Sequence, residues 1–267
     1  MEQPKNNFKL VTDKKNARML LPNMLTLIGV CIGLTSIRFA LSGEFHLAII
    51  AIIFAALIDG LDGRIARLIK GTSKVGKELD SLTDMISFGV APAFIMYFWK
   101  LNTFGRFGWL LCLVYVICVA LRLARFNISS NQESSWRDNF FEGVPSPAGG
   151  ILVLTPLIIS LSGFDYIKIN YDIIVPIFFI VTSFLLISKF PTYSFKKIVI
   201  QRKATIFLLF AIVLFFGLLL IYTFNVIAIS SIIYLSLIPI SFFHYQKMKK
   251  IHENDKIQDE DDLEDVL

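Results

Sequence analysis

Four aspartates lie within one stretch, DGLDGRIARLIKGTSKVGKELDSLTD, which spans residues 59–84. Asp59 and Asp62 are three positions apart, and Asp80 and Asp84 are four apart, so on helices each pair projects from one face. Carboxylates that converge cannot all stay ionised without cations, and ligation by oxygen alone favours hard divalent ions such as Mg²⁺ or Mn²⁺. Two such ions held close together would clamp a phosphate or a diphosphate. The stretch therefore predicts a metal site that handles a phosphate-bearing substrate.

The residues between the two aspartate pairs favour a turn and an anionic ligand. The segment GTSKVGK contains two glycines, a serine and a threonine, which is typical of a tight turn between helices. Gly63 and Ala66 are small and leave room for a ligand to approach the backbone. Arg64 and Arg67 add positive charge that suits an anionic substrate. The lysines of this stretch have a simpler explanation, because basic residues gather on the cytoplasmic side of membrane proteins.

The elements that must position these aspartates are membrane helices. Of the 267 residues, 55% are hydrophobic and only 18% are charged, whereas soluble domains carry about 25% charged residues. Apolar runs of roughly 20 residues recur along the chain, and single strands would leave their backbone groups unsatisfied in lipid. We therefore predict an all-α polytopic membrane protein without a soluble domain for nucleic acid. The eight predicted spans are residues 22–41, 45–66, 79–99, 107–126, 148–163, 172–190, 205–222 and 226–243.

The distribution of basic residues predicts the orientation in the membrane. An even number of spans places both termini and the aspartate stretch on one side, together with most of the Lys and Arg residues. By the positive-inside rule this side is cytoplasmic, so the active site faces the cytoplasm, from the inner membrane if the source is bacterial. Residues 253–267 hold eight acids and one lysine and are predicted to be a disordered tail. The opposite side receives Arg38, Lys100, Arg106 and Lys168.

The aspartate stretch also resembles a known family signature. Its fixed positions match those of the CDP-alcohol phosphatidyltransferases throughout. The resemblance implies a six-helix catalytic core over residues 22–190. The other segments are then a basic cytoplasmic or interfacial arm (1–21), two additional spans (191–246) and a cytoplasmic tail (247–267). The matching positions are Asp59-x-x-Asp62-Gly63-x-x-Ala66-Arg67, then eight residues, then Gly76-x-x-x-Asp80-x-x-x-Asp84.

The resemblance implies a reaction and a role for each residue. Members of this family displace CMP from a CDP-linked lipid and join the phosphatidyl group to an alcohol. The resemblance also implies that this protein forms a homodimer. Asp59, Asp62 and Asp80 would ligate Mg²⁺ or Mn²⁺, while Asp84 would be the general base and also contact a metal. The residues expected at the CDP-lipid are Gly63, Arg67 and Ser73, with Asn23 and Thr26 of LPNMLTL, a segment similar to the entrance of the family's first span. The alternative is that the last two only cap a helix and pack.

Three further stretches resemble the phosphatidylserine synthase branch of this family, namely ELDSLTDMISFGVAPAFIMY, ALRLARFN and FEGVPSPAGG. They imply transfer from CDP-diacylglycerol to L-serine, whose carboxylate needs a cation. Arg122 and Arg125 share a helix face and would meet that carboxylate in bidentate fashion. Alternatively, both extend to lipid phosphates. Asn127 is a weaker candidate that could only cap its helix, and GVPSPAGG (143–150) is either a loop over the site or a turn at membrane entry.

Two other functions fit the same residues. The first is the same family chemistry with another acceptor, such as glycerol 3-phosphate, inositol phosphate or choline. The second is a divalent-cation transporter that uses the aspartates as a pathway. A transporter would favour polar residues throughout the membrane depth, whereas the acids in this sequence cluster near one predicted face.

Overall fold

The computed structural model describes residues 14–69, 71, 73–129, 140–163, 169–193 and 202–264. Most of the predicted arm (1–21) lies outside these residues. The two strands are β1 (Phe140–Glu142) and β2 (Pro191–Tyr193). The helices are α1 (Lys14–Leu41), α2 (Phe45–Leu68), α3 (Lys74–Asp84), the π-helix η1 (Met85–Val90), α4 (Ala91–Trp99), the 3₁₀ helix η2 (Leu101–Phe104), α5 (Arg106–Ser129), α6 (Ser146–Leu161), α7 (Tyr171–Ile187), α8 (Arg202–Ile221) and α9 (Thr223–Glu264).

Apolar helices coincide with all the predicted spans. Five of them are long and apolar enough to cross a membrane, and three are shorter. The long ones are Leu20–Leu41, Phe45–Leu68, Lys74–Trp99, Arg106–Ile128 and Thr223–Gln246, and the shorter ones are Ser146–Leu161, Tyr171–Ile187 and Thr205–Ile221. The chain is therefore an all-α polytopic membrane protein, as predicted, while the count of eight crossings stays a prediction.

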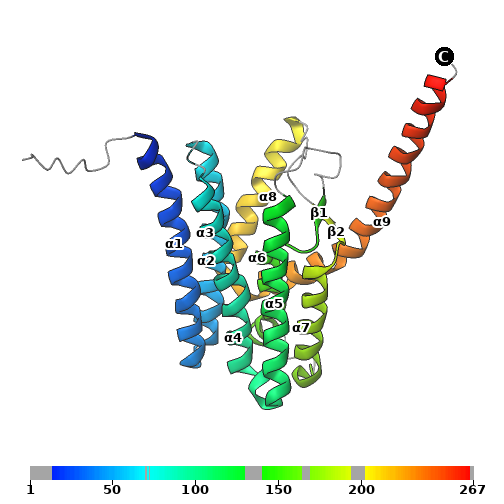
Figure 1. Ribbon diagram of the computed structural model, residues 1–267. Helices are drawn as coiled ribbons and strands as arrows, with labels where there is room; N and C mark the ends of the chain where they lie inside the picture. The colour runs from blue at the N-terminus through cyan, green and yellow to red at the C-terminus, as the bar shows by residue number, and fades with distance from the viewer. Residues whose placement is uncertain are drawn as a thin grey trace, which may run out of the picture.

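The helices from α1 to α7 stand side by side in one bundle (Figure 1). Their buried apolar side chains form the main core, in which Phe88, Tyr115 and Phe179 are among the largest fully buried residues. The start of α1, the α2–α3 turn and the end of α9 lie at the same end of the molecule, at the top of Figure 1. This arrangement agrees with the prediction that the aspartate stretch and both ends of the chain share one side.

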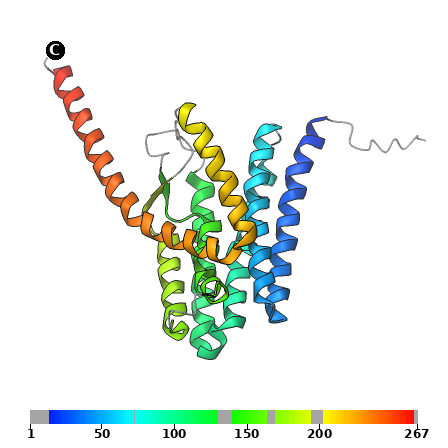
Figure 2. The ribbon, with the colours of Figure 1, turned by 180° about the vertical axis from the view of Figure 1, so that it is seen from behind.

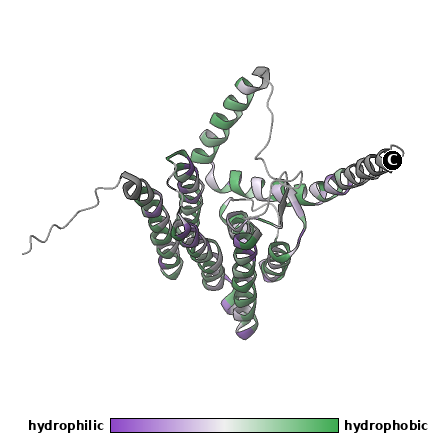
Figure 3. Cartoon of the chain, turned by 45° about the horizontal axis from the view of Figure 1, so that its top comes forward, coloured by the Kyte–Doolittle hydropathy of each residue, from purple (hydrophilic) through white to green (hydrophobic). Residues whose placement is uncertain are grey.

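The last two helices do not form a simple up-and-down pair. Helix α8 lies apart from the bundle and is hydrophobic along its length (Figure 3), with exposed apolar residues such as Phe207 and Leu209. Helix α9 first crosses beside the middle of the bundle and then rises to the C-terminal end (Figure 2). Helix α9 is described as far as Glu264, while the predicted disorder of the acidic tail stays a prediction.

The helix that carries Asp84 changes its winding directly after this residue. Helix α3 passes into the π-helical turn η1 and then into α4 without a break. Pro92 has no N–H with which to reach the carbonyl of Phe88, four positions earlier. The buried Tyr115 hydroxyl of α5 donates to that carbonyl at 2.7 Å instead. The irregular turn below Asp84 is thus tied to a neighbouring helix.

Two glycines let other helices approach this turn closely. A Cβ added to Gly33 of α1 would lie 2.5 Å from Ser87 Oγ and 3.1 Å from Ser87 Cα. One added to Gly150 of α6 would lie 3.2 to 3.3 Å from the side chain and backbone of Phe88. Since α1, α5 and α6 all touch η1, the backbone that follows Asp84 has little freedom to move.

A small antiparallel sheet fixes the beginning of α6. Strand β1 pairs with β2, and the buried Thr192 hydroxyl of β2 donates to the Gly143 carbonyl at 2.8 Å. Gly143 has a φ of 75°, and a Cβ there would lie 2.8 Å from the Ser188 carbonyl oxygen, so the position requires glycine. This turn sets the place at which Ser146 begins α6.

The close approach at Gly33 generates a stability prediction. Replacing Gly33 with alanine should lower the thermal unfolding temperature in detergent, because the added methyl group meets the Ser87 backbone, and overpacking of this kind costs about 1–3 kcal/mol. Gly217→Ala is the matched control, since a Cβ at this helical glycine of α8 meets nothing within 4 Å. A Gly33→Ala protein as stable as the Gly217→Ala protein would contradict the packing described.

Candidate active site

Three aspartates from two helices bring their carboxylates together. Asp59 and Asp62 come from α2 and Asp80 comes from α3, and one oxygen of each lies within 4.8 Å of the others. The hairpin that joins the two helices agrees with the predicted turn. Ser73 caps α3, since its Oγ accepts a hydrogen bond from the Gly76 N–H at 2.9 Å. The spacing of the aspartates thus produces one cluster, as the sequence predicts.

The fourth aspartate joins this cluster from the end of α3. Its carboxyl group lies close enough to that of Asp59 for a hydrogen bond. Ser146 Oγ donates to Asp84 Oδ2 at 2.6 Å. The other oxygen, Asp84 Oδ1, is buried and has no hydrogen-bond partner among the described residues. Ser146 therefore holds one oxygen of Asp84, while the carboxyl group as a whole lies against Asp59.

Thr26 of α1 donates a hydrogen bond to one of the aspartates, Asp62. Its hydroxyl lies 2.7 Å from Asp62 Oδ2 and 3.0 Å from the Pro22 carbonyl, and it is buried. Asp62 itself is only 3% exposed, so this contact fixes the orientation of its carboxylate. The prediction that Thr26 belongs to the site is consistent with this position, although its described partner is a carboxylate.

Asn23 lies beside the first turn of α3. A Cβ added to Gly76 would be 2.8 Å from Asn23 Oδ1 and 3.0 Å from Ser73 Oγ. This close approach explains why the signature has glycine at position 76. The alternative that Asn23 caps a helix is wrong, because α1 begins nine residues earlier, at Lys14.

Gly63 and Arg67 lie on the open side of α2. Both are exposed, and a Cβ added to Gly63 would meet nothing within 4 Å, which leaves room for a ligand at the backbone. Arg67 Nε donates to the Gly63 carbonyl at 3.1 Å, so the guanidinium group lies along this face. Contact of Gly63, Arg67 and Ser73 with a CDP moiety stays a prediction.

The two arginines of α5 have different surroundings. Arg122 Nη1 donates to Ser146 Oγ at 3.0 Å, which links it through one hydroxyl to Asp84. Arg125 Nη1 donates instead to the Ile187 carbonyl at the end of α7, at 2.7 Å. The two arginines, which were predicted to share a helix face and one ligand, therefore have different hydrogen-bond partners. The structure joins Arg122 to the aspartates and uses Arg125 to hold α7.

Ser146 is the residue that the sequence-based prediction missed. For its segment, GVPSPAGG, the sequence predicts only a loop over the site or a turn at membrane entry. A serine between two prolines at the start of a helix was the available signal, because prolines fix the backbone and thereby the direction of the hydroxyl. Asn127, in contrast, does not cap its helix but bonds to Ser81 Oγ of α3 at 3.0 Å, which aligns α5 with the acidic helix.

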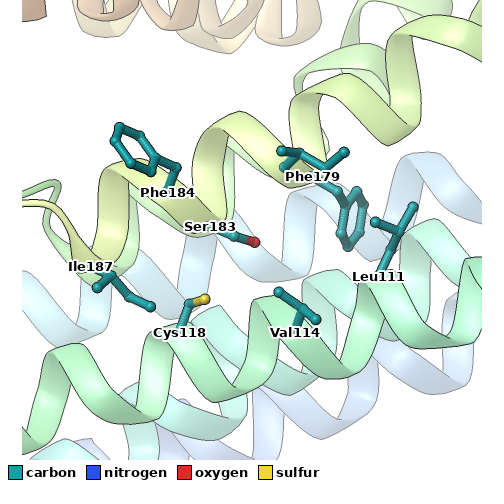
Figure 4. Close-up of a pocket in the computed structure, with 8 residues that line it drawn as sticks. Leu111, Val114, Cys118, Phe179, Ser183, Phe184 and Ile187 are labelled. Atoms are coloured by element: carbon teal, nitrogen blue, oxygen red, sulfur yellow. The ribbon is translucent and has the colours of Figure 1, made fainter.

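A separate apolar groove lies between α5 and α7 (Figure 4). Its volume is about 280 Å³, and none of its eight lining residues is charged. Cys118 and Ser183 are the polar members of this lining. The lining of this groove contains no carboxylate, histidine, lysine or arginine.

The cluster fits divalent cations. Its three converging ligand groups are carboxylates, and hard ions such as Mg²⁺ and Mn²⁺ prefer oxygen ligands. Thr26 at Asp62 is the kind of outer partner that orients a metal ligand. Which ion binds stays a prediction.

The contact between Thr26 and Asp62 generates a second prediction. Thr26→Val should weaken Mn²⁺ binding about 10- to 100-fold, because the Asp62 carboxylate loses the hydroxyl that orients it. Titration of the purified protein followed by electron paramagnetic resonance measures this affinity. Thr35→Val is the control on the same helix, since the exposed Thr35 hydroxyl donates only to its own helix, at the Cys31 carbonyl. Equal Mn²⁺ affinity of the two variants would argue against a metal at Asp62.

Comparison with known proteins places these residues in a family. Residues 19–178 match the family model described as CDP-alcohol phosphatidyltransferase. A Mycobacterium leprae protein named CDP-diacylglycerol--serine O-phosphatidyltransferase is 45% identical over 144 residues, which is 53% of this chain and 48% of that protein. A Helicobacter pylori protein of the same name is 38% identical over 183 residues, which is 68% of this chain and 76% of that protein.

A eukaryotic relative extends the comparison. A Saccharomyces cerevisiae protein with the same name is 42% identical over 125 residues, which is 44% of this chain and 45% of that protein. The chain thus spans about half the length of the Mycobacterium and yeast relatives and 76% of the Helicobacter one. The matched segment contains the whole aspartate hairpin with its surrounding helices, and the chain belongs to the CDP-alcohol phosphatidyltransferase family.

Proposed function

We propose that the protein transfers the phosphatidyl group of CDP-diacylglycerol to the hydroxyl group of L-serine and forms phosphatidylserine and CMP. The observation that carries this proposal is the link from the aspartate cluster through Ser146 to Arg122. The aspartates suit a diphosphate held by metals, and an arginine close to the base suits an acceptor with a carboxylate. The names of relatives at 38–45% identity support the same acceptor.

The donor half of the site would be built by α2 and α3. Asp59, Asp62 and Asp80 would hold Mg²⁺ or Mn²⁺, with Asp84 within reach of the same ions. Bound divalent ions would neutralise the diphosphate and stabilise the charge on departing CMP. The proposed contacts to the CDP moiety are made by Gly63, Arg67, Ser73 and Asn23, with Thr26 behind Asp62.

The acceptor half would centre on Asp84. Its Oδ1 is buried and unpartnered among the described residues, so it is placed to take the proton of the serine hydroxyl. The serine oxygen then attacks the phosphorus that carries the diacylglycerol. The bond from that phosphorus to the bridging oxygen of the diphosphate breaks, and CMP leaves with the electron pair. Arg122 would bind the serine carboxylate, while Arg125 is occupied by α7.

The orientation in the membrane belongs to the same proposal. The excess of Lys and Arg on the side of the aspartate stretch favours a cytoplasmic active site, where serine and CMP are soluble. The common position of the start of α1, the hairpin turn and the end of α9 supports this topology (Figure 1). The homodimer that the family resemblance implies stays a prediction.

The acceptor is tested with purified protein, CDP-diacylglycerol and each alcohol in turn. We expect CMP release with L-serine in the presence of Mg²⁺ or Mn²⁺, and little with glycerol 3-phosphate, inositol phosphate or choline. Release of CMP with one of these three and not with serine would assign the protein to another branch of the family. No release with any of them would favour a different function, such as ion transport.

Substitution of the proposed base gives a further prediction. Asp84→Asn should reduce CMP release by about 100-fold or more while CDP-diacylglycerol binding is largely retained, because the amide cannot accept the proton. Asp172→Asn is the control, since this exposed carboxylate lies in the first turn of α7 and pairs with Lys100 at 2.9 Å. Undiminished turnover by the Asp84→Asn protein would exclude Asp84 as the base.

A further inference from the structure

Buried polar atoms without partners gather where α9 meets the active site. Asp84 Oδ1, Arg122 Nε and the Tyr234 hydroxyl are all buried, and none has a hydrogen-bond partner among the described residues. A fourth atom of this kind, Ser241 Oγ, lies about two turns further along α9. Buried polar groups normally find partners, so a cluster of unpartnered ones indicates that a ligand completes them.

Tyr234 reaches this position because α9 packs on the beginning of α6. Tyr234 and Leu235 contact a small apolar cluster made of Val144, Leu152 and Ile238. This cluster joins α9 to the beginning of α6, where Ser146 lies. Contact between α9 and strand β2 holds the same region from the other side.

The Tyr234 side chain lies near that of Arg122. The two side chains are close enough to interact electrostatically. Thr192 also lies near the Tyr234 hydroxyl, but their contact does not reach hydrogen-bonding geometry, and the Thr192 hydroxyl already donates to Gly143. By this geometric criterion the Tyr234 hydroxyl has no hydrogen-bond partner among the described residues.

The three unpartnered atoms have complementary chemistry. Arg122 Nε and the Tyr234 hydroxyl are donors, whereas Asp84 Oδ1 is an acceptor. Arg122 and Asp84 are joined by the Ser146 hydroxyl, with bonds of 3.0 and 2.6 Å. A small alcohol that carries a carboxylate matches this set, because its carboxylate accepts two hydrogen bonds and its hydroxyl donates one. Choline has no anionic group for the two donors.

We infer that Tyr234 is a specificity-determining residue that binds the acceptor carboxylate together with Arg122. This inference rests on the proposed transfer to serine and adds the residue by which the enzyme distinguishes serine from alcohols without a carboxylate. Tyr234 lies on α9, beyond residues 19–178 that match the family model. The acceptor site therefore draws on a helix outside the segment that builds the diphosphate site.

The test compares two acceptors on one variant. Serinol has a hydroxymethyl group where L-serine has its carboxylate, so it lacks the group that Tyr234 binds. Tyr234→Phe should lower kcat/KM for L-serine about 10- to 100-fold, the loss expected for a hydrogen bond to a charged group. The same variant should change kcat/KM for serinol by less than about threefold, since this acceptor never makes that bond. Both are measured as CMP release from CDP-diacylglycerol.

The control and the outcomes separate this inference from the proposed function. Tyr222→Phe, at an exposed tyrosine between α8 and α9, should leave both kcat/KM values unchanged. An equal loss with both acceptors would show that Tyr234 only supports the fold, and no loss with serine would show that it does not bind the carboxylate. Either result overturns the inference. Failure of the wild-type protein to use serine would instead overturn the proposed function.

Discussion

A carboxylate among apolar helices is stable only where its charge is compensated, and this protein gathers four of them in one place. Three have oxygens within 4.8 Å of one another, and the fourth lies against Asp59. Among the described residues, compensation comes from the hydroxyls of Thr26 and Ser146, from the Gly63 backbone and, through Ser146, from Arg122. Bound divalent cations, which suit a cluster of carboxylates, would compensate the remaining charge. The acidic hairpin is therefore proposed to be complete only with its metal ions and substrate.

The helices that pack against the α2–α3 hairpin hold its carboxylates in a defined geometry. Asp84 is the last residue of α3, and the π-helical turn that follows is held by a tyrosine from α5 and by glycine contacts from α1 and α6. Insertions of this kind are frequent at functional sites, since they change the direction of side chains without ending a helix. Here the turn separates a polar helical segment that carries the acids from an apolar one that packs in the core. Asp84 stands at the boundary and can face both the metals and the acceptor.

Local periodicity was enough to predict the acidic half of the site. Spacings of three and four residues place each aspartate pair on one face, and glycines with a serine predict the turn that joins the two helices. Periodicity could not show that Arg122 and Arg125 diverge, because their partners, Ser146 and the Ile187 carbonyl, belong to helices far away in the sequence. Tyr234 was invisible for the same reason, since nothing in its apolar surroundings indicates which helix α9 meets.

The proposed site has a diphosphate half and an acceptor half, and only the diphosphate half can be predicted from a sequence motif. A diphosphate held by metals demands carboxylates in a fixed arrangement, and that demand is the same whichever alcohol reacts, so a compact motif on two adjacent helices satisfies it. The acceptor differs between enzymes of one chemistry, and its recognition needs only a few polar groups aimed at Asp84 from the opposite side. In the proposed site those groups would come from α5, α6 and α9, three helices whose positions depend on the tertiary packing rather than on one motif. The Ser146 hydroxyl would then couple the two halves, because it contacts both Asp84, the proposed base, and Arg122, the cation that would receive the carboxylate.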